Sequence, residues 1–127
     1  MAENDKPSGG KPSPKLIFAC SGAADVGEIS DKAARKLTRD GLGKMFCLAG
    51  IGGRVEPIIN AGKSASLLLA IDGCELDCAK NCLEKAGFEN FQHLRITDMG
   101  MEKGKSPATD ERVAEVADIV KDLLNNG

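Results

Sequence analysis

The sequence predicts an α/β fold: a small open parallel sheet of about four strands with flanking helices, in Rossmann- or flavodoxin-like layers. Short continuous apolar runs alternate with segments of helical periodicity, which is typical of strands buried on both faces and joined by crossover helices. The chain of 127 residues, 42% of them hydrophobic, fits one domain with one core. We expect the strand order 2-1-3-4, the simplest doubly wound arrangement of four such strands.

Residues 1–14 are expected to form a disordered tail, because they are rich in proline, glycine and serine and have no apolar periodicity. A single α/β metal-binding domain is then expected over residues 15–127. Its strands are predicted from apolar runs at 16–20, 45–49 and 67–71, and from a weaker run at 91–96.

Four helices are predicted between and after these strands. The first places Val26, Ile29, Ala33 and Leu37 on one face and ends before Gly41. A shorter helix begins near Pro57 and ends by Gly62, and a third runs from about 76 to 86 and stops at Gly87. The last begins near Thr109 with two acidic residues in its first turn.

The composition excludes several classes of function. With 17 basic and 19 acidic residues and a net charge of −2, the chain has no basic excess to bind nucleic acid. No apolar run is long enough to cross a membrane, and the start lacks the pattern of a signal peptide, so we expect a cytoplasmic protein. Disulfides are rare in that compartment, and the five cysteines therefore indicate metal binding, thiol chemistry or core packing.

Three of these cysteines recur at equal intervals. Cys20, Cys47 and Cys74 are each separated by 27 residues, about one strand-helix unit, and each lies at or near the carboxyl end of a predicted strand. Such ends share one edge of a parallel sheet, so the three thiols should converge there. Cys78 follows Cys74 by four residues, a spacing that places two side chains on one face of a helical turn.

Cys82 is expected to differ from the other four. In a continuous helix it would lie roughly 12 Å from Cys74 along the axis, too far for both to bind one zinc ion. It also falls among apolar residues of the predicted helix, where a free cysteine packs as a small hydrophobic side chain. We therefore interpret Cys82 as a core residue.

These residues resemble a known family. The segments Cys20-Ser21-Gly22, Cys47 before a glycine-rich turn, and Ile71-Asp72-Gly73-Cys74 followed by Cys78 are similar to the DGC domain, named for its central motif. The resemblance covers about residues 15–104. It implies zinc chelation by four cysteines, which in this sequence are Cys20, Cys47, Cys74 and Cys78.

Two further functions compete with a zinc-binding protein. Four thiolates can also hold an iron-sulfur cluster. Alternatively, Cys20 or Cys74 is the nucleophile of a thiol, sulfur-transfer or redox enzyme, although the chain lacks a cysteine pair with a two-residue spacer. His93, the single histidine, is interpreted as a structural or exposed residue. The glycine-rich segments at 50–53 and 62–64 do not complete a nucleotide-binding motif.

Overall fold

The computed structural model describes residues 13–126, so the tail expected at 1–14 lies outside the described residues except for its last two positions. Four parallel strands form one sheet in the order β2-β1-β3-β4, which confirms the predicted fold class and topology. The strands are β1 (Lys15–Ala19), β2 (Lys44–Met45), β3 (Leu67–Asp72) and β4 (Gln92–Arg95).

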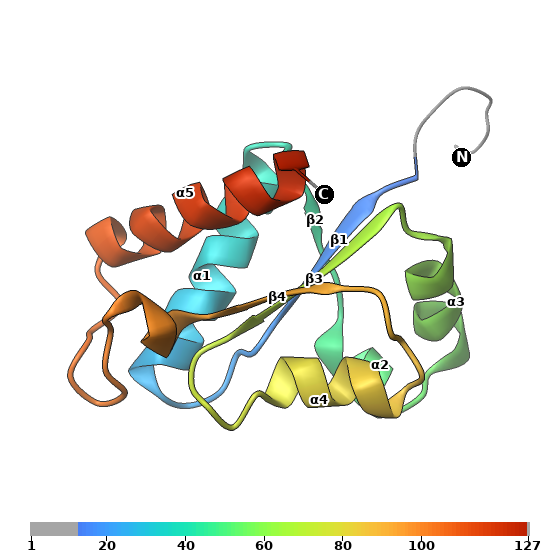
Figure 1. Cartoon of the computed structure of the whole chain (residues 1–127), viewed down its shortest axis with the longest axis horizontal. Helices are drawn as coiled ribbons and strands as arrows, with labels where there is room; N and C mark the ends of the chain where they lie inside the picture. Colours follow the sequence, from blue (N-terminus) through green and yellow to red (C-terminus); the bar gives the residue numbers. More distant parts are fainter. Residues whose placement is uncertain (1–12, 127) are drawn as a thin grey trace.

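Helices cover both faces of the sheet (Figure 1). On one face lie α1 (Asp25–Arg39) and α5 (Asp110–Asn126), and on the other lie α2 (Leu48–Gly52), α3 (Glu56–Ser64) and α4 (Cys78–Lys85). Glycines with positive φ follow two helices, Gly41 at 76° after α1 and Gly87 at 96° after α4. Both were predicted as helix stops, because glycine adopts the left-handed conformation without a steric cost.

The two central strands separate two apolar clusters. Ile17, Ala19, Leu69 and Ile71 pack with α1 and α5, whereas Leu16, Phe18, Leu68 and Ala70 pack with the helices of the opposite face. Alternate residues of a strand point to opposite faces, so a continuous apolar run is what a doubly covered strand requires.

The strand expected at 45–49 is wrong beyond Met45. β2 has two residues, pairs only with β1, and is followed after Cys47 by the five-residue helix α2. Two contacts favour the helix: the Cys47 sulfur accepts a hydrogen bond from the Gly50 N–H, and a Cβ at Gly50 would lie 2.7 Å from Ile58. The glycines therefore let α2 pack closely on α3, where a turn was expected.

The region around α4 and β4 also differs from the prediction in detail. α4 begins at Cys78, two residues later than expected, because Asp77 adopts a left-handed φ of 53°. β4 is followed directly by a short 3-10 helix, η1 (Ile96–Met99), which the sequence pattern did not indicate. No helix within residues 13–126 is long and apolar enough to span a membrane.

Candidate metal centre

Four cysteines lie at the carboxyl edge of the sheet, where the sequence placed them. Cys20 directly follows β1, and its N–H donates to the carbonyl of Ile71 in β3 at 2.9 Å. Cys47 is the N-cap of α2, two residues after β2. Cys74 lies in the loop that follows β3, and Cys78 is the first residue of α4.

Cys78 lies among other acidic groups. Partial desolvation raises the pKa of its thiol, and the negative charges of Cys20, Asp72, Cys74 and Cys82 raise it further. Thiols from the ends of β1 and β3 and from α4 therefore interact through space. A cation at this edge would reverse that repulsion and favour the thiolates.

The thiol sulfur atoms do not form the closed tetrahedron of a zinc site. Four sulfurs around one zinc, each about 2.3 Å from it, are about 3.8 Å apart. Within the part of the chain that the structure describes, no three cysteine sulfurs lie within 4.8 Å of one another. Binding of one ion by all four thiols therefore requires their side chains to move. Gly22 places no side chain beside the Cys20 thiol, since a Cβ there would lie 3.6 Å from its sulfur. Soft thiolate donors are the set that zinc or an iron-sulfur cluster prefers, so these residues fit either group.

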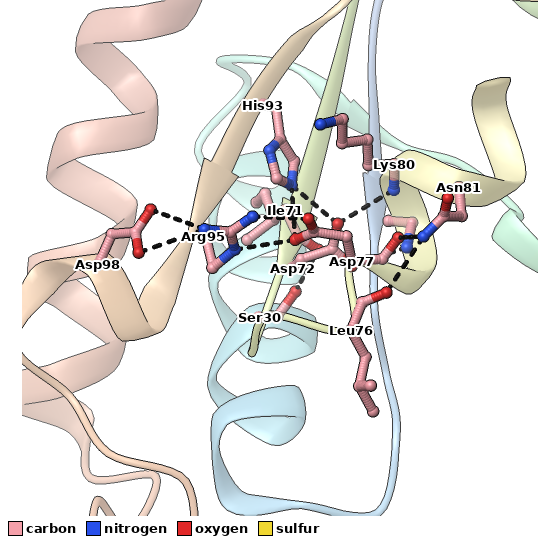
Figure 2. A network of polar contacts seen from close by, with 11 residues as sticks. Ser30, Ile71, Asp72, Leu76, Asp77, Lys80, Asn81, His93, Arg95 and Asp98 are labelled. Atoms are coloured by element: carbon pink, nitrogen blue, oxygen red, sulfur yellow. Dashed lines mark hydrogen bonds and ion pairs between the residues drawn. The ribbon is translucent and has the colours of Figure 1, made fainter.

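Asp72 holds the loop between β3 and α4 from within the protein (Figure 2). Its side chain is 1% exposed and accepts hydrogen bonds from the backbone N–H groups of Ala79 at 2.7 Å and Lys80 at 3.0 Å. His93 Nε2 lies 2.9 Å from the second carboxylate oxygen. Because the first N–H groups of a helix have no partner within it, Asp72 acts as a remote cap of α4 and positions Cys78.

Asp77 and Arg95 brace the same loop from β4. Arg95 donates to Asp77 through Nε at 2.9 Å and through Nη2 at 2.6 Å, a bidentate ion pair. The guanidinium holds the pKa of the Asp77 carboxyl below its usual range. Arg95 also lies 3.4 Å from Asp98. Arg95 was not predicted from the sequence, although its place at the end of a strand beside the cysteine edge was an available signal.

Asp72, Asp77 and His93 also bring potential metal-ligand atoms together. One such atom from each of the three side chains lies within 4.8 Å of the other two. Their donors and acceptors are already engaged. The Asp72 oxygens accept from two helix N–H groups and face His93, and the Arg95 guanidinium occupies the cationic position beside Asp77. This cluster therefore supports the loop, which agrees with the structural role expected for His93.

Gly73 permits a close approach of backbones. A Cβ at this position would lie 2.8 Å from the carbonyl carbon of Val26 and 2.9 Å from the nitrogen of Gly27, both in the first turn of α1. A Cβ at Gly27 would in turn lie 2.8 Å from the carbonyl oxygen of Gly22. The loop after β3, the start of α1 and the loop after β1 are thus stacked backbone against backbone, which brings Cys74 and Cys20 to the same place.

Cys82 has two environments. It packs against the apolar cluster of α2, α3 and α4, as expected for a core residue, and a Cβ at Gly52 would lie 3.5 Å from its sulfur. It also lines a cavity of about 450 Å³ together with Cys47. Because Cys74 precedes α4, the helical separation that set Cys82 apart from Cys74 does not apply; only Cys78 and Cys82 share the helix.

Two comparisons with known proteins found a match. The model of the DGC domain family matches residues 16–120, which include all five cysteines. The anaerobic and virulence modulator AnvM of Pseudomonas aeruginosa is 36% identical over 88 residues, which cover 69% of this chain and 67% of that protein. No solved structure matches the chain. The family match extends over most of the sequence and contains the Asp72-Gly73-Cys74 segment, and the chain belongs to the DGC domain family.

Proposed function

We propose that this chain is a small cytoplasmic metal-binding protein that holds zinc through the thiolates of Cys20, Cys47, Cys74 and Cys78. The supporting observation is the position of Cys20, Cys47 and Cys74 after three parallel strands at one edge of the sheet, with Cys78 at the start of α4. Partial desolvation raises the pKa of the Cys78 thiol, and the negative charges of Cys20 and Cys74 raise it further. Uncompensated thiolates at one edge repel one another, and a dication removes that repulsion.

Several residues of the chain position the loops that contain the proposed ligands. Asp72, through the start of α4, and Arg95, through Asp77, fix the loop that contains Cys74 and Cys78. The close contact of Gly73 with α1 fixes the distance between the loop of Cys74 and the loop of Cys20. Bound zinc would supply positive charge that keeps the thiols deprotonated and would join the segments after β1, β2 and β3.

The chemistry supports a regulatory, carrier or structural metal over a catalytic one. Four protein thiolates fill a tetrahedral zinc site and leave no open position for a substrate. The relative AnvM is named as a modulator, which favours the regulatory role. Because metal-binding energy is also folding energy at such sites, loading and release would change the stability of the whole edge.

Elemental analysis and a visible spectrum test this proposal on protein purified anaerobically without chelators. We expect zinc close to one per chain and a colourless sample; less than about 0.3 metal ions per chain contradicts the proposal. The chain has no Trp and no Tyr, so an iron-sulfur cluster would be conspicuous as broad absorption near about 400 nm. Such a spectrum would show that the same thiols hold an iron-sulfur cluster and not zinc.

Single cysteine variants test the ligand set. Serine at Cys20, Cys47, Cys74 or Cys78 should each abolish stoichiometric binding, whereas Cys82→Ser should retain it. Retention of zinc by Cys20→Ser would refute the convergence of strand ends on one ion. Retention by Cys47→Ser together with loss in Cys82→Ser would assign the fourth ligand to Cys82, which shares a cavity with Cys47.

The alternative, a sulfur-transfer or redox enzyme with Cys20 or Cys74 as nucleophile, has one supporting contact. The ammonium of Lys103 lies 3.8 Å from the Cys74 sulfur, and a neighbouring cation favours a nucleophilic thiolate. Mild oxidation of the metal-free chain discriminates the two functions. A single disulfide formed rapidly by Cys74 and reversed by thiols would support the enzyme, whereas uniformly slow oxidation of all accessible cysteines would exclude it.

A further inference from the structure

We propose that Lys103 provides the compensating positive charge of the thiolate centre and that residues 100–107 are folded to hold it there. The inference rests on the proposed function, because it treats Cys74 as a metal ligand. A zinc ion with four thiolates has a net charge of −2, so a nearby protein cation stabilises the loaded site.

The position of Lys103 is the first observation. Its Nζ lies 3.8 Å from the sulfur of Cys74, a residue 29 positions earlier in the sequence. No carboxylate of the described residues lies within 4.0 Å of this ammonium, whereas Lys105 in the same segment pairs with Glu102 at 3.8 Å. The charge of Lys103 is therefore directed to the thiol edge, and no acid within residues 13–126 is paired with it.

The second observation is that the backbone on both sides of Lys103 is anchored. Asp25, the first residue of α1, accepts hydrogen bonds from the N–H groups of Gly104 at 2.9 Å and Ser106 at 3.0 Å. The Ser106 side chain is buried in turn and accepts from the N–H of Glu102 at 2.8 Å. The residues before and after Lys103 thus have fixed partners, which limits the positions that its side chain reaches.

Asp25 explains how the segment is linked to the site. The hydrogen bond from Gly104 and those from Ser106 and Val26 lower the pKa of its carboxyl, so the anion is occupied by backbone donors. Asp25 also begins the helix that follows the Cys20 loop, and the next residues, Val26 and Gly27, contact Gly73. One turn of α1 therefore orients the loops of Cys20, Cys74 and Lys103 relative to one another.

Zinc affinity of the full chain tests the inference, with Lys103→Gln compared against the matched control Lys105→Gln. Both variants remove one positive charge from the same segment, but only Lys103 contacts a proposed ligand. Competition with a chromophoric chelator should show affinity about fivefold weaker for Lys103→Gln at low ionic strength, and a smaller difference in about 1 M salt. Lys105→Gln should stay within about 1.5-fold of the unmodified chain.

Alkylation of the metal-free chain provides a readout that does not need the metal. Iodoacetate and iodoacetamide attack the same thiolate, so the ratio of their rates at Cys74 cancels its degree of ionisation and reports the local potential. We expect the ratio to fall about threefold in Lys103→Gln and to stay unchanged in Lys105→Gln. Asp25→Ala should also lower the ratio, although the lysine remains, because its anchor is lost.

The outcomes separate this inference from the proposed function. An unmodified chain that binds no zinc refutes the proposed function, and the role of Lys103 at a metal centre fails with it. An unmodified chain that binds zinc, together with equal affinities and equal alkylation ratios for Lys103→Gln and Lys105→Gln, refutes the role of Lys103 alone. An unchanged ratio in Asp25→Ala refutes the role of the folded segment.

Discussion

The connections after β3 and after β2 both place cysteines at the same edge of the sheet, but they differ in how firmly they are held. β3 has six residues, pairs on both sides, and is followed by a loop fixed through the nearly fully buried Asp72. β2 has two residues, lies at the border of the sheet, and is followed by the exposed Cys47. The Cys47 sulfur makes a local contact, because it accepts a 3.3 Å hydrogen bond from the Gly50 N–H.

This difference indicates how the site would close. Cys74 and Cys78 start from positions that a buried polar network determines, so their ordering costs little when a metal binds. Cys47 lies beside a cavity of about 450 Å³ and can change position with less disturbance of the core. We therefore expect the β2 side of the edge to move toward the β3 side when a metal binds, and variants on the two sides should differ in their effects.

The largest effect is expected from Asp72→Ala. Removal of the carboxylate leaves the N–H groups of Ala79 and Lys80 without their partner in a buried place, which should cost on the order of 3 kcal/mol. Urea unfolding of the metal-free chain measures this. Asp98→Ala is the control, because that side chain is 65% exposed and should cost less than about 0.5 kcal/mol. Equal losses in the two variants would show that Asp72 does not brace the loop.

A somewhat smaller effect is expected from Gly73→Ala. The new methyl group would meet the backbone of α1 at 2.8 Å, and a helix backbone cannot move aside as a flexible side chain can. Overpacking of this kind costs about 2 kcal/mol. The same variant should weaken zinc binding, because the Cys74 loop must move away from that of Cys20. Unfolding and metal competition on one sample measure both effects, and unchanged values would contradict the stacked-loop arrangement.

The contrast between β3 and β2 also explains what the sequence could predict. The β1 and β3 runs are apolar on both faces, as strands covered by helices on both sides require. Their predicted limits agree with the structure to within a residue. The run at 45–49 is equally apolar, but the contact between Gly50 and Ile58 selects a helix, and that contact joins residues of different elements. Periodicity does not contain such tertiary information.

In the site, too, some features could be predicted from the sequence pattern, whereas others depend on tertiary contacts. Even spacing and a parallel sheet were enough to place Cys20, Cys47 and Cys74 at one edge, because the carboxyl ends of parallel strands lie on the same side of the sheet. The roles of Arg95 and Lys103 depend on tertiary contacts: Arg95 ends β4 and lies 18 residues after Asp77, and Lys103 lies in the segment after η1, 29 residues after Cys74. The start of α4 depends on the left-handed Asp77, a conformation that an aspartate only occasionally adopts.

Asp77→Asn should have a moderate, pH-dependent effect. Arg95 lowers the pKa of Asp77 in the folded chain, so the ionised carboxylate stabilises the fold above its unfolded pKa, and this contribution is lost as the pH falls through the folded pKa. The variant should therefore be about 1 kcal/mol less stable at neutral pH and equal to the unmodified chain well below about pH 4. Unfolding curves at several pH values measure the difference.

A companion variant separates charge from conformation at this position. Asparagine tolerates the left-handed φ of 53°, whereas alanine does not, so Asp77→Ala should lose about 1 kcal/mol more than Asp77→Asn at every pH. A difference between asparagine and aspartate that persists in acid would show that the ion pair with Arg95 does not account for the effect.

The smallest effect on stability, and a sharp test of the β2 side, is expected from Gly52→Ala. Gly52 is the last residue of α2, and an added Cβ would lie 3.5 Å from the Cys82 sulfur, an ordinary contact. Because alanine restricts the unfolded chain more than glycine does, the variant should be more stable by about 0.5 kcal/mol. Zinc affinity should be unchanged if Cys82 stays packed against α2, since none of the proposed ligands contacts the new methyl group. A clear change in affinity would mean that Cys82 turns toward the ion, and that the fourth ligand comes from α4 instead of the connection after β2.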